Sequence, residues 1–327
     1  MLNLQPRHRG AAVLSLTLLT LTGLCTAQTP NATPVAAAGA GAGLTNGALV
    51  ASGGISGATA PVPQLKGFNF TLNSTSQHSS VTGWSSMLTP DLSFRFDKHF
   101  SLDVNVPYYL DIQNFVQTTV KKVTTYPLEQ SGNLIGDTGI SGHFNIGAGD
   151  FGYGLNASGS FPTGDSKFGL TANAATYNVT NHLEYSLGRF NPDIEAGEGN
   201  SSSLVNHGVK KSYTAVGPIA NFQAGGSIDL PFKSSLDLEA YEALPLGNQD
   251  VYGTVTKTNK KGKTVAKQTL EGTGVAEDNG INAELDVPLC PHLVLAGMYQ
   301  RSLIQGTDTA GISLTWVLRT PKKKAAH

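Results

Sequence analysis

The sequence predicts an all-β chain that forms a closed antiparallel transmembrane β-barrel of about 12 strands. Apolar and polar residues alternate through one segment after another from residue 67 onward. Charged residues make up 14% of the chain and hydrophobic residues 39%, both below the ~25% and ~45–50% of average soluble domains. Short and long connections also alternate along the chain. This combination is typical of a barrel in lipid, because only one face of each strand has to be apolar.

The N-terminal region predicts two segments that precede the barrel. Arg7 and Arg9 stand before the apolar run 11–24, and the small residue Ala27 follows it. These are the three parts of a secretory signal peptide over 1–27, since a run of ~14 residues is short for a membrane span. Residues 28–63 are rich in Ala, Gly, Thr and Pro and predict a flexible periplasmic segment. We expect the barrel over 64–320 and a basic C-terminal tail over 321–327.

The stretch FSLDVNVPY at 100–108 shows the alternation most plainly, because Phe100, Leu102 and Val104 alternate with Ser101 and Asp103. Period-two alternation predicts a strand with one apolar and one polar face. Eleven further segments are read in the same way. In chain order the predicted strands are 68–73, 90–96, 100–108, 140–146, 153–161, 177–185, 193–196, 220–230, 236–241, 281–287, 293–304 and 312–319. The segment 293–304 is apolar on both faces, so the sequence leaves its phase open.

The connections decide which surface the apolar faces contact. Predicted tight turns lie at 97–99, 148–150, 188–189, 232–233 and 290–292. Predicted long connections lie at 76–83, 111–134, 163–172, 200–212, 247–278 and 305–309, and the one at 247–278 has the pattern of a protruding hairpin. A soluble sandwich has no reason to sort its loops in this way. Outer-membrane barrels do, with short turns in the periplasm and long loops outside. We therefore expect a place in the bacterial outer membrane, with the apolar faces on lipid.

Charged residues on the polar faces predict an inner collar near the periplasmic turns. The acidic members come from five strands and are Asp103, Asp193, Asp229, Asp237 and Asp286. Arg95 and Arg319 fall at about the same level. One interpretation is a salt-bridged layer that only satisfies the interior. The other is a collar that makes a pore favour cations, because rings of carboxylates attract cations.

Other chemistry finds little support in the sequence. The histidines are far apart, without the close pairing of zinc sites, so we expect no metal and no cofactor. The segment QHSS at 77–80 sets His and Ser side by side rather than in the arrangement of a catalytic triad, and we expect no enzyme. A net charge of −1 gives no field that would attract nucleic acid.

Three segments resemble a known family. GNLIGDTGISGHFNIG at 132–147 and GSFPTGD at 159–165 are similar to the Gly-Asp strand and the Pro-Thr-Gly-Asp segment of the outer-membrane barrel family named for the meta-pathway of phenol degradation. LVLAGMYQRSLIQG at 293–306 resembles its penultimate strand. The resemblance implies an outer-membrane channel or transporter for small aromatic or hydrophobic compounds.

Two functions remain open from the sequence. The first is a channel or transporter for a small-molecule solute. The second is a structural or surface-interaction barrel that acts through its extracellular loops. In either case we expect outer-membrane lipid and the barrel-insertion machinery as partners, and no nucleic acid.

Overall fold

The structure is a computed structural model that describes residues 67–318, apart from residues 116, 121–122, 126, 166–169, 172–173, 207–210, 259–263 and 275–276. The signal peptide, the 28–63 segment and the basic tail, all expected from the sequence, lie outside the described residues. Among the described residues, no helix is long and apolar enough to cross a membrane.

The described chain is a closed antiparallel β-barrel of twelve strands, so the predicted fold class is confirmed. The first two strands are β1 (Gly67–Ser79) and β2 (Gly83–Arg95). The third is β3 (Phe100–Asn105) continued by β4 (Tyr108–Phe115), and the fourth is built from β7 (Leu128–Ser131), β8 (Leu134–Ile135) and β9 (Thr138–Ala148). The remaining strands are β10 (Phe151–Phe161), β11 (Thr176–Tyr185), β12 (Phe190–Asn206), β13 (Lys211–Asp229), β14 (Ser235–Pro245), β17 (Asp278–Cys290), β18 (Leu293–Ser302) and β19 (Asp308–Leu318).

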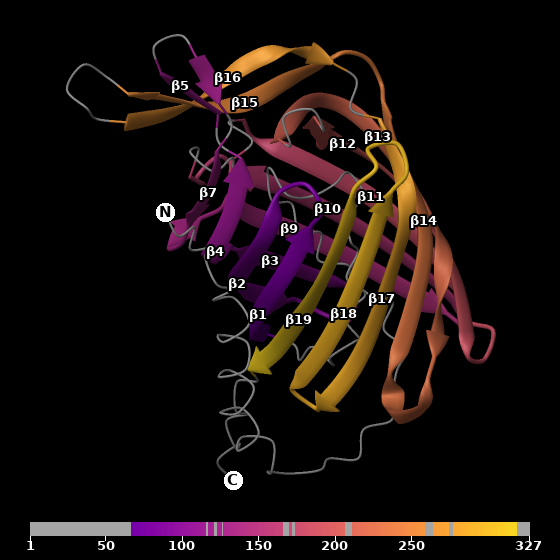
Figure 1. The fold of residues 1–327 in the computed structure, drawn as a ribbon. Coiled ribbons are helices and arrows are strands. Elements are labelled where there is room, and N and C mark those ends of the chain that lie inside the picture. The colour runs from indigo at the N-terminus through magenta and orange to yellow at the C-terminus, as the bar shows by residue number, and fades with distance from the viewer. Residues whose placement is uncertain are drawn as a thin grey trace. The chain divides into compact units, whose positions relative to one another are not determined.

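The wall closes where the last strand meets the first. Residues 70–79 of β1 pair with residues 309–318 of β19, and β1 pairs with β2 on its other side. Figure 1 shows the yellow β19 beside the indigo β1. Closure is required because lipid offers no hydrogen-bonding partner to a free strand edge.

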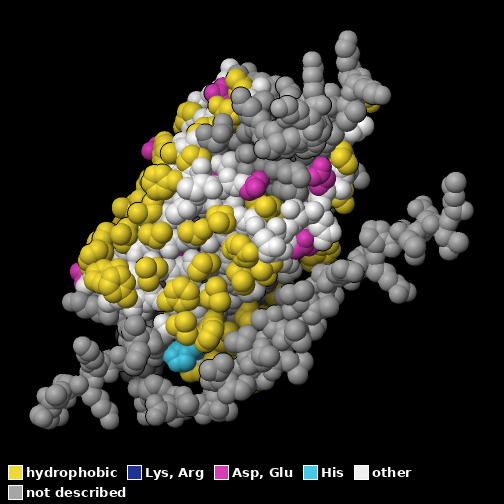
Figure 2. All heavy atoms as spheres, turned by 90° about the vertical axis from the view of Figure 1, so that its left-hand side faces the viewer, with side chains coloured by type: hydrophobic (Ala, Val, Ile, Leu, Met, Phe, Trp, Pro, Cys, Tyr) yellow, Lys and Arg dark blue, Asp and Glu magenta, His cyan; other side chains and the backbone are white. Residues whose placement is uncertain are grey.

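The side chains are arranged inside out relative to a soluble protein, as the alternation predicts. The outward-facing Phe68 is 58% exposed and Leu238 is 48% exposed, whereas their inward-facing neighbours Asn69 and Asp237 are 3% and 7% exposed. Hydrophobic side chains cover much of the wall seen in Figure 2. A lipid-facing surface of this kind is what a membrane barrel needs.

The structure settles the phase of β18, which the sequence left open. Val294, Ala296 and Gln300 are buried on the inner face, while Tyr299 is 40% exposed on the outer face. The alternation was ambiguous because small apolar residues line the inner face of this strand near the turn that precedes it.

The predicted third strand ends differently in the structure. The strand predicted at 100–108 is interrupted at Val106 and Pro107, and β4 then continues the wall through a region predicted as loop 111–134. The prediction was wrong here because proline lacks the N–H group that a continuous ladder requires. Two short strands, β5 (Gln117–Val120) and β6 (Val123–Thr125), follow in that region, and β7 begins the fourth barrel strand within it.

Two of the predicted long connections are shorter than expected. Only residues 80–82 join β1 to β2, and β12 extends to Asn206 while β13 begins at Lys211. The connection between β18 and β19 keeps its predicted length and lies at 303–307. The predictions at 76–83 and 200–212 were wrong because a strand that extends beyond the lipid no longer needs an apolar outer face. Its alternation therefore fades before its ladder ends.

The predicted hairpin at 247–278 is present. β15 (Gln249–Thr258) pairs with β16 (Thr264–Gly274), and β15 also pairs with β13 and, in parallel, with β5. Figure 1 shows these strands at one end of the barrel, here called the loop end. The short connections at 96–99, 149–150, 186–189, 230–234 and 291–292 define the opposite end, here called the turn end.

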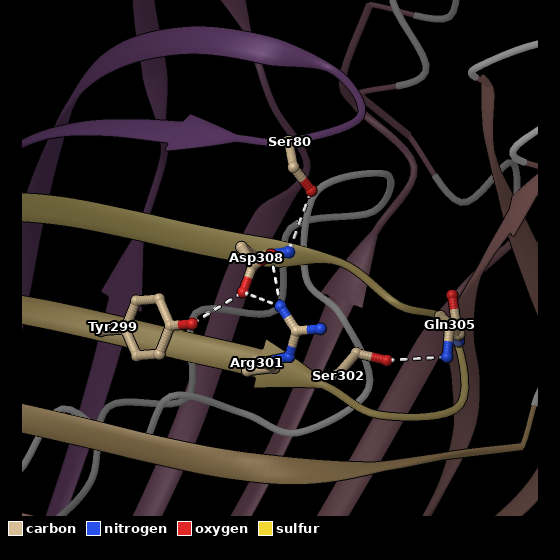
Figure 3. A network of polar contacts seen from close by, with 6 residues as sticks. All are labelled: Ser80, Tyr299, Arg301, Ser302, Gln305 and Asp308. Atoms are coloured by element: carbon tan, nitrogen blue, oxygen red, sulfur yellow. Dashed lines mark hydrogen bonds and ion pairs between the residues drawn. The ribbon is translucent and has the colours of Figure 1, made fainter.

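A polar clamp fastens the closure seam at the loop end (Figure 3). The backbone N–H of Ser80 donates to the carbonyl of Asp308 over 2.8 Å, and the N–H of Asp308 donates to Ser80 Oγ over 2.9 Å. The carboxylate of Asp308 accepts from Tyr299 Oη and from Arg301 Nη1, each over 2.7 Å. The clamp thus joins the β1–β2 turn to the first residue of β19.

The outward and inward faces predict opposite responses to a charge. Leu155 lies on the outer face of β10, so Leu155→Arg should cost about 2–4 kcal/mol of folding free energy at mid-membrane. Asn156→Arg places the same charge on the inner face and should still fold. Heat-modifiable migration on gels after refolding into vesicles measures both variants, and equal failure of the two would contradict the assignment of the faces.

The longest connections predict the orientation of the barrel, because they lie at the loop end, where the β15–β16 hairpin is one of them. With both native cysteines replaced by serine, Leu303→Cys at the loop end should react on intact cells with a membrane-impermeant thiol reagent. Lys98→Cys at the turn end should react only after the outer membrane is opened. Labelling of Lys98→Cys alone on intact cells would reverse the orientation.

Candidate functional site

Carboxylates gather on one part of the inner face, across β11, β12, β14 and β17. Their outward-facing neighbours are apolar, as at Ile194, Leu238 and Leu285, so strand alternation turns the acidic residues inward. We call this group the acidic wall. Its members are Glu184, Asp193, Glu195, Asp237, Glu239, Glu284 and Asp286.

The strand register sets these carboxylates directly opposite one another. Glu184 lies opposite Asp193, and Asp237 lies opposite Glu284. Gly225 of β13 lies between Asp193 and Glu239 in the same row and contributes no side chain. Opposed residues have Cβ atoms only about 4.5–5.5 Å apart, and like charges at that position repel.

Few groups on these strands offset the negative charge. His182 Nε2 lies 3.8 Å from Glu184 Oε2, and His182 Nδ1 lies 3.9 Å from Glu195 Oε2. The side-chain amide of Gln223 donates to Glu239 Oε2. The sequences of β11, β12, β14 and β17 contain no lysine and no arginine. The acidic wall is therefore a region of negative potential inside the barrel.

The structure brings some of the predicted collar residues together. Asp193, Asp237 and Asp286 belong to the acidic wall, with Asp237 only 7% exposed and Asp286 fully buried. Asp229 is exposed at the end of β13 and still interacts electrostatically with Asp237.

The other predicted collar residues lie apart from that wall. Asp103 is on β3, where it forms a separate pair. Arg95 points back to its own turn, where its Nε donates to the carbonyl of Asp97 over 2.8 Å and its Nη2 to that of Lys98 over 3.0 Å. Arg319 lies outside the described residues.

The glutamates of the acidic wall were missed by the sequence reasoning. Alternation along the predicted strands 177–185, 193–196, 236–241 and 281–287 sets four glutamates on polar faces, and these are Glu184, Glu195, Glu239 and Glu284. The collar prediction kept only residues at equal distance from a turn. Strands in a barrel are staggered, so the pairing register and not the distance from a turn sets the level of a side chain.

A smaller charged group lies on β2, β3 and β9. His143 Nε2 is 2.9 Å from Asp103 Oδ2, and both residues are buried. Asp91 interacts electrostatically with both. Among the described residues, no group of three or more His, Cys, Asp or Glu side chains could hold a metal ion.

The segment after β10 is fastened to the wall by two short motifs. The N–H of Gly164 donates to Asp137 Oδ1 over 2.9 Å, and the N–H of Thr138 donates to Thr163 Oγ1 over 2.9 Å. The N–H of Asp165 donates to the carbonyl of Ile135 over 2.9 Å. We call these contacts the Asp137 lock. It joins the Gly-Asp and Pro-Thr-Gly-Asp segments, both of which carry the family resemblance.

The Asp137 lock is followed along the chain by Leu170, whose side chain is buried inside the barrel. The N–H of Leu170 donates to the carbonyl of Asp165 over 3.0 Å, and Leu170 packs with Met87, Tyr109 and Ile112 as a buried apolar cluster. A Cβ at Gly164 would lie 2.1 Å from the carbonyl oxygen of Leu170, so only glycine permits this approach. The interior therefore has an apolar part on β2 and β4 in addition to the acidic wall.

Comparison with known proteins places the fold. No protein-family model and no curated protein sequence matches the chain. Among solved structures, an outer-membrane channel from Pseudomonas putida F1 is similar, with a TM-score of 0.50 and 9% identity over 78% of this chain and 97% of that one. The NanC porin gives a TM-score of 0.44 and 8% identity over 75% and 98%. A mutant of the monoaromatic hydrocarbon channel TodX gives 0.36 and 11% over 78% and 91%.

The likeness to the Pseudomonas putida channel shows the fold. The chain is a β-barrel of the bacterial outer-membrane type, and the predicted location in that membrane is confirmed. At 9% identity the comparison carries no further than this.

The Asp137 lock predicts a measurable loss of stability. Asp137 is 1% exposed, and Asp137→Ala leaves the N–H of Gly164 without its acceptor. An unpaired buried donor costs about 1–3 kcal/mol, so the midpoint of urea unfolding in vesicles should fall. Asp150→Ala, at an exposed turn, is the matched control. An equal midpoint for Asp137→Ala and the wild type would show that the lock contributes nothing.

Proposed function

We propose that this chain is a passive channel of the outer membrane, in the family that its Gly-Asp and Pro-Thr-Gly-Asp segments resemble. The observation that carries the proposal is the inner face. Buried side chains such as Asn69, Ser93 and Thr315 are polar, and a barrel interior lined in this way is typical of aqueous channels. Transport and not catalysis is the proposed activity.

The resemblance favours small aromatic or hydrophobic compounds as solutes, and the acidic wall adds a preference for positive charge. Carboxylates that line a pore attract cations and repel anions. If Asp103 on β3 acts together with the acidic wall as a collar, it adds to this attraction of cations. Outer-membrane lipid is the proposed partner of the apolar outer face, and the barrel-insertion machinery places the chain there.

A second candidate is a surface-interaction barrel that acts through its loops. The observation in its favour is the β15–β16 hairpin, which pairs with β13 and β5 at the loop end. A steady conductance across a planar bilayer supports the channel, and its absence in a folded barrel supports the second candidate.

The acidic wall predicts the ion preference of the channel. In a KCl gradient the reversal potential should show a preference for K⁺, because the wall has carboxylates and no lysine or arginine in its strands. Asp237→Asn combined with Glu284→Gln should reduce that preference, and high salt should screen it. Asp103→Asn tests the collar separately. A fall in K⁺ preference in this variant would show that carboxylates outside the acidic wall contribute to it. Preference for Cl⁻ in the wild type would contradict the prediction.

A further inference from the structure

We propose that the acidic wall binds organic cations that carry two ammonium groups, at a site centred on Asn282. This proposal rests on the proposed channel function and names the class of solute. It is argued from an unsatisfied amide, from the spacing of the carboxylates around it and from the absence of metal geometry.

The side chain of Asn282 is buried and has no hydrogen bond. Asn282 is 7% exposed, and neither its amide oxygen nor its amide nitrogen has a partner among the described residues. Ile281 and Leu285 face outward on β17. Asn282 has the opposite place in the alternation, so it faces into the barrel. A buried polar group without a partner costs free energy and requires an explanation such as a ligand.

Asn282 belongs to the first of two neighbouring centres of negative charge on β14 and β17, formed by Glu239 with Asn282 and by Asp237 with Glu284. It is directly opposite Glu239, whose row continues across Gly225 to Asp193. The next inward residue along β17 is Glu284, which lies opposite Asp237. Residues two apart on one face of a strand are separated by roughly 6.5–7 Å, so the two centres are about that far apart.

Gly225 makes room for a ligand at the first centre. Its row would otherwise hold a side chain between Asp193 and Glu239, and both carboxylates interact electrostatically across that position. An ammonium group can donate three hydrogen bonds. Placed between Glu239 and Asn282, it would donate to the Asn282 amide oxygen and to the Glu239 carboxylate, and the hydrogen bond to the carboxylate is assisted by charge.

The spacing favours a diamine over an inorganic ion. A metal ion needs several ligands converging on one point, and no such group of His, Cys, Asp or Glu exists among the described residues. Two charge centres about one strand step apart fit instead two ammonium groups joined by a short aliphatic chain. The spacer would lie along β14 and β17, between the row of Glu239 and Asn282 and the row of Asp237 and Glu284.

Calorimetric titration of the full-length protein in detergent tests the site without relying on conduction. The probe is 1,4-diaminobutane, with 1-aminobutane and Mg²⁺ as comparison cations. We expect the diamine to bind about tenfold or more tightly than either, because only it can occupy both centres. Equal affinity for all three cations, or no binding of the diamine, would overturn the proposal.

Variants locate the site on the wall. Glu239→Gln combined with Glu284→Gln should weaken diamine binding about tenfold or more, and Asn282→Ala should weaken it several-fold. Asn282→Asp keeps the shape and adds a carboxylate, so it should bind the diamine more tightly and remains informative if Asn282→Ala does not fold. Asp91→Asn, which removes an inward carboxylate near β3, should leave the affinity unchanged. Loss in Asp91→Asn equal to that in the double variant would overturn the location.

Conduction is measured separately, so the two proposals can fail independently. Diamine binding without conductance supports the site and contradicts the channel. Conductance without diamine binding supports the channel and contradicts the site. Block of the K⁺ current by the diamine in the wild type, and its loss in the double variant, would support both.

Discussion

The requirement that every backbone N–H and C=O be paired inside lipid governs this molecule. A sheet can meet it only by closing on itself, and here closure depends on the pairing of β1 with β19. The two strands come from opposite ends of the described chain, so the barrel is complete only when both are in place. The clamp of Ser80 and Asp308 lies at the loop end of that seam and ties the neighbouring turn to the last strand.

Closure makes a wall one residue thick, and this links the outer surface to the interior. Wherever Ile194 or Leu238 faces lipid, the next residue along the strand faces inward. A chain that reserves its apolar residues for lipid must therefore fill its interior with polar ones. The acidic wall is an extreme case, because opposed carboxylates such as Asp237 and Glu284 repel one another without a lysine or arginine in their strands. The apolar cluster around Leu170 shows that the same interior can hold an apolar region where a connecting segment folds back.

Much of the fold could be predicted from particular residues. Phe100, Leu102 and Val104 fixed the outer face of one strand, and the same alternation found all twelve strands. Alternation did not predict the course of the third strand at Pro107, where the strand breaks but the wall continues. It also did not predict the full length of β12 and β13, because their outer face no longer needs apolar residues beyond the lipid. The candidate site was predicted in part. Asp193, Asp237 and Asp286 were identified. The glutamates beside them depend on the register between strands, and the Asp137 lock depends on how the segment after β10 folds back. Alternation along a single strand contains neither kind of information.

The sequence by itself determined which residues face lipid and which face inward, because that choice depends only on the period of two along each strand. It therefore determined the class of fold and the polar character of the interior. The tertiary structure alone decided which inward residues meet. The stagger of neighbouring strands sets Asp193 in one row with Glu239 across Gly225, and it sets Asn282 opposite Glu239, one row from the pair of Asp237 and Glu284. Stagger arises from how the closed sheet tilts and pairs, which is a property of all the strands together and of no single one.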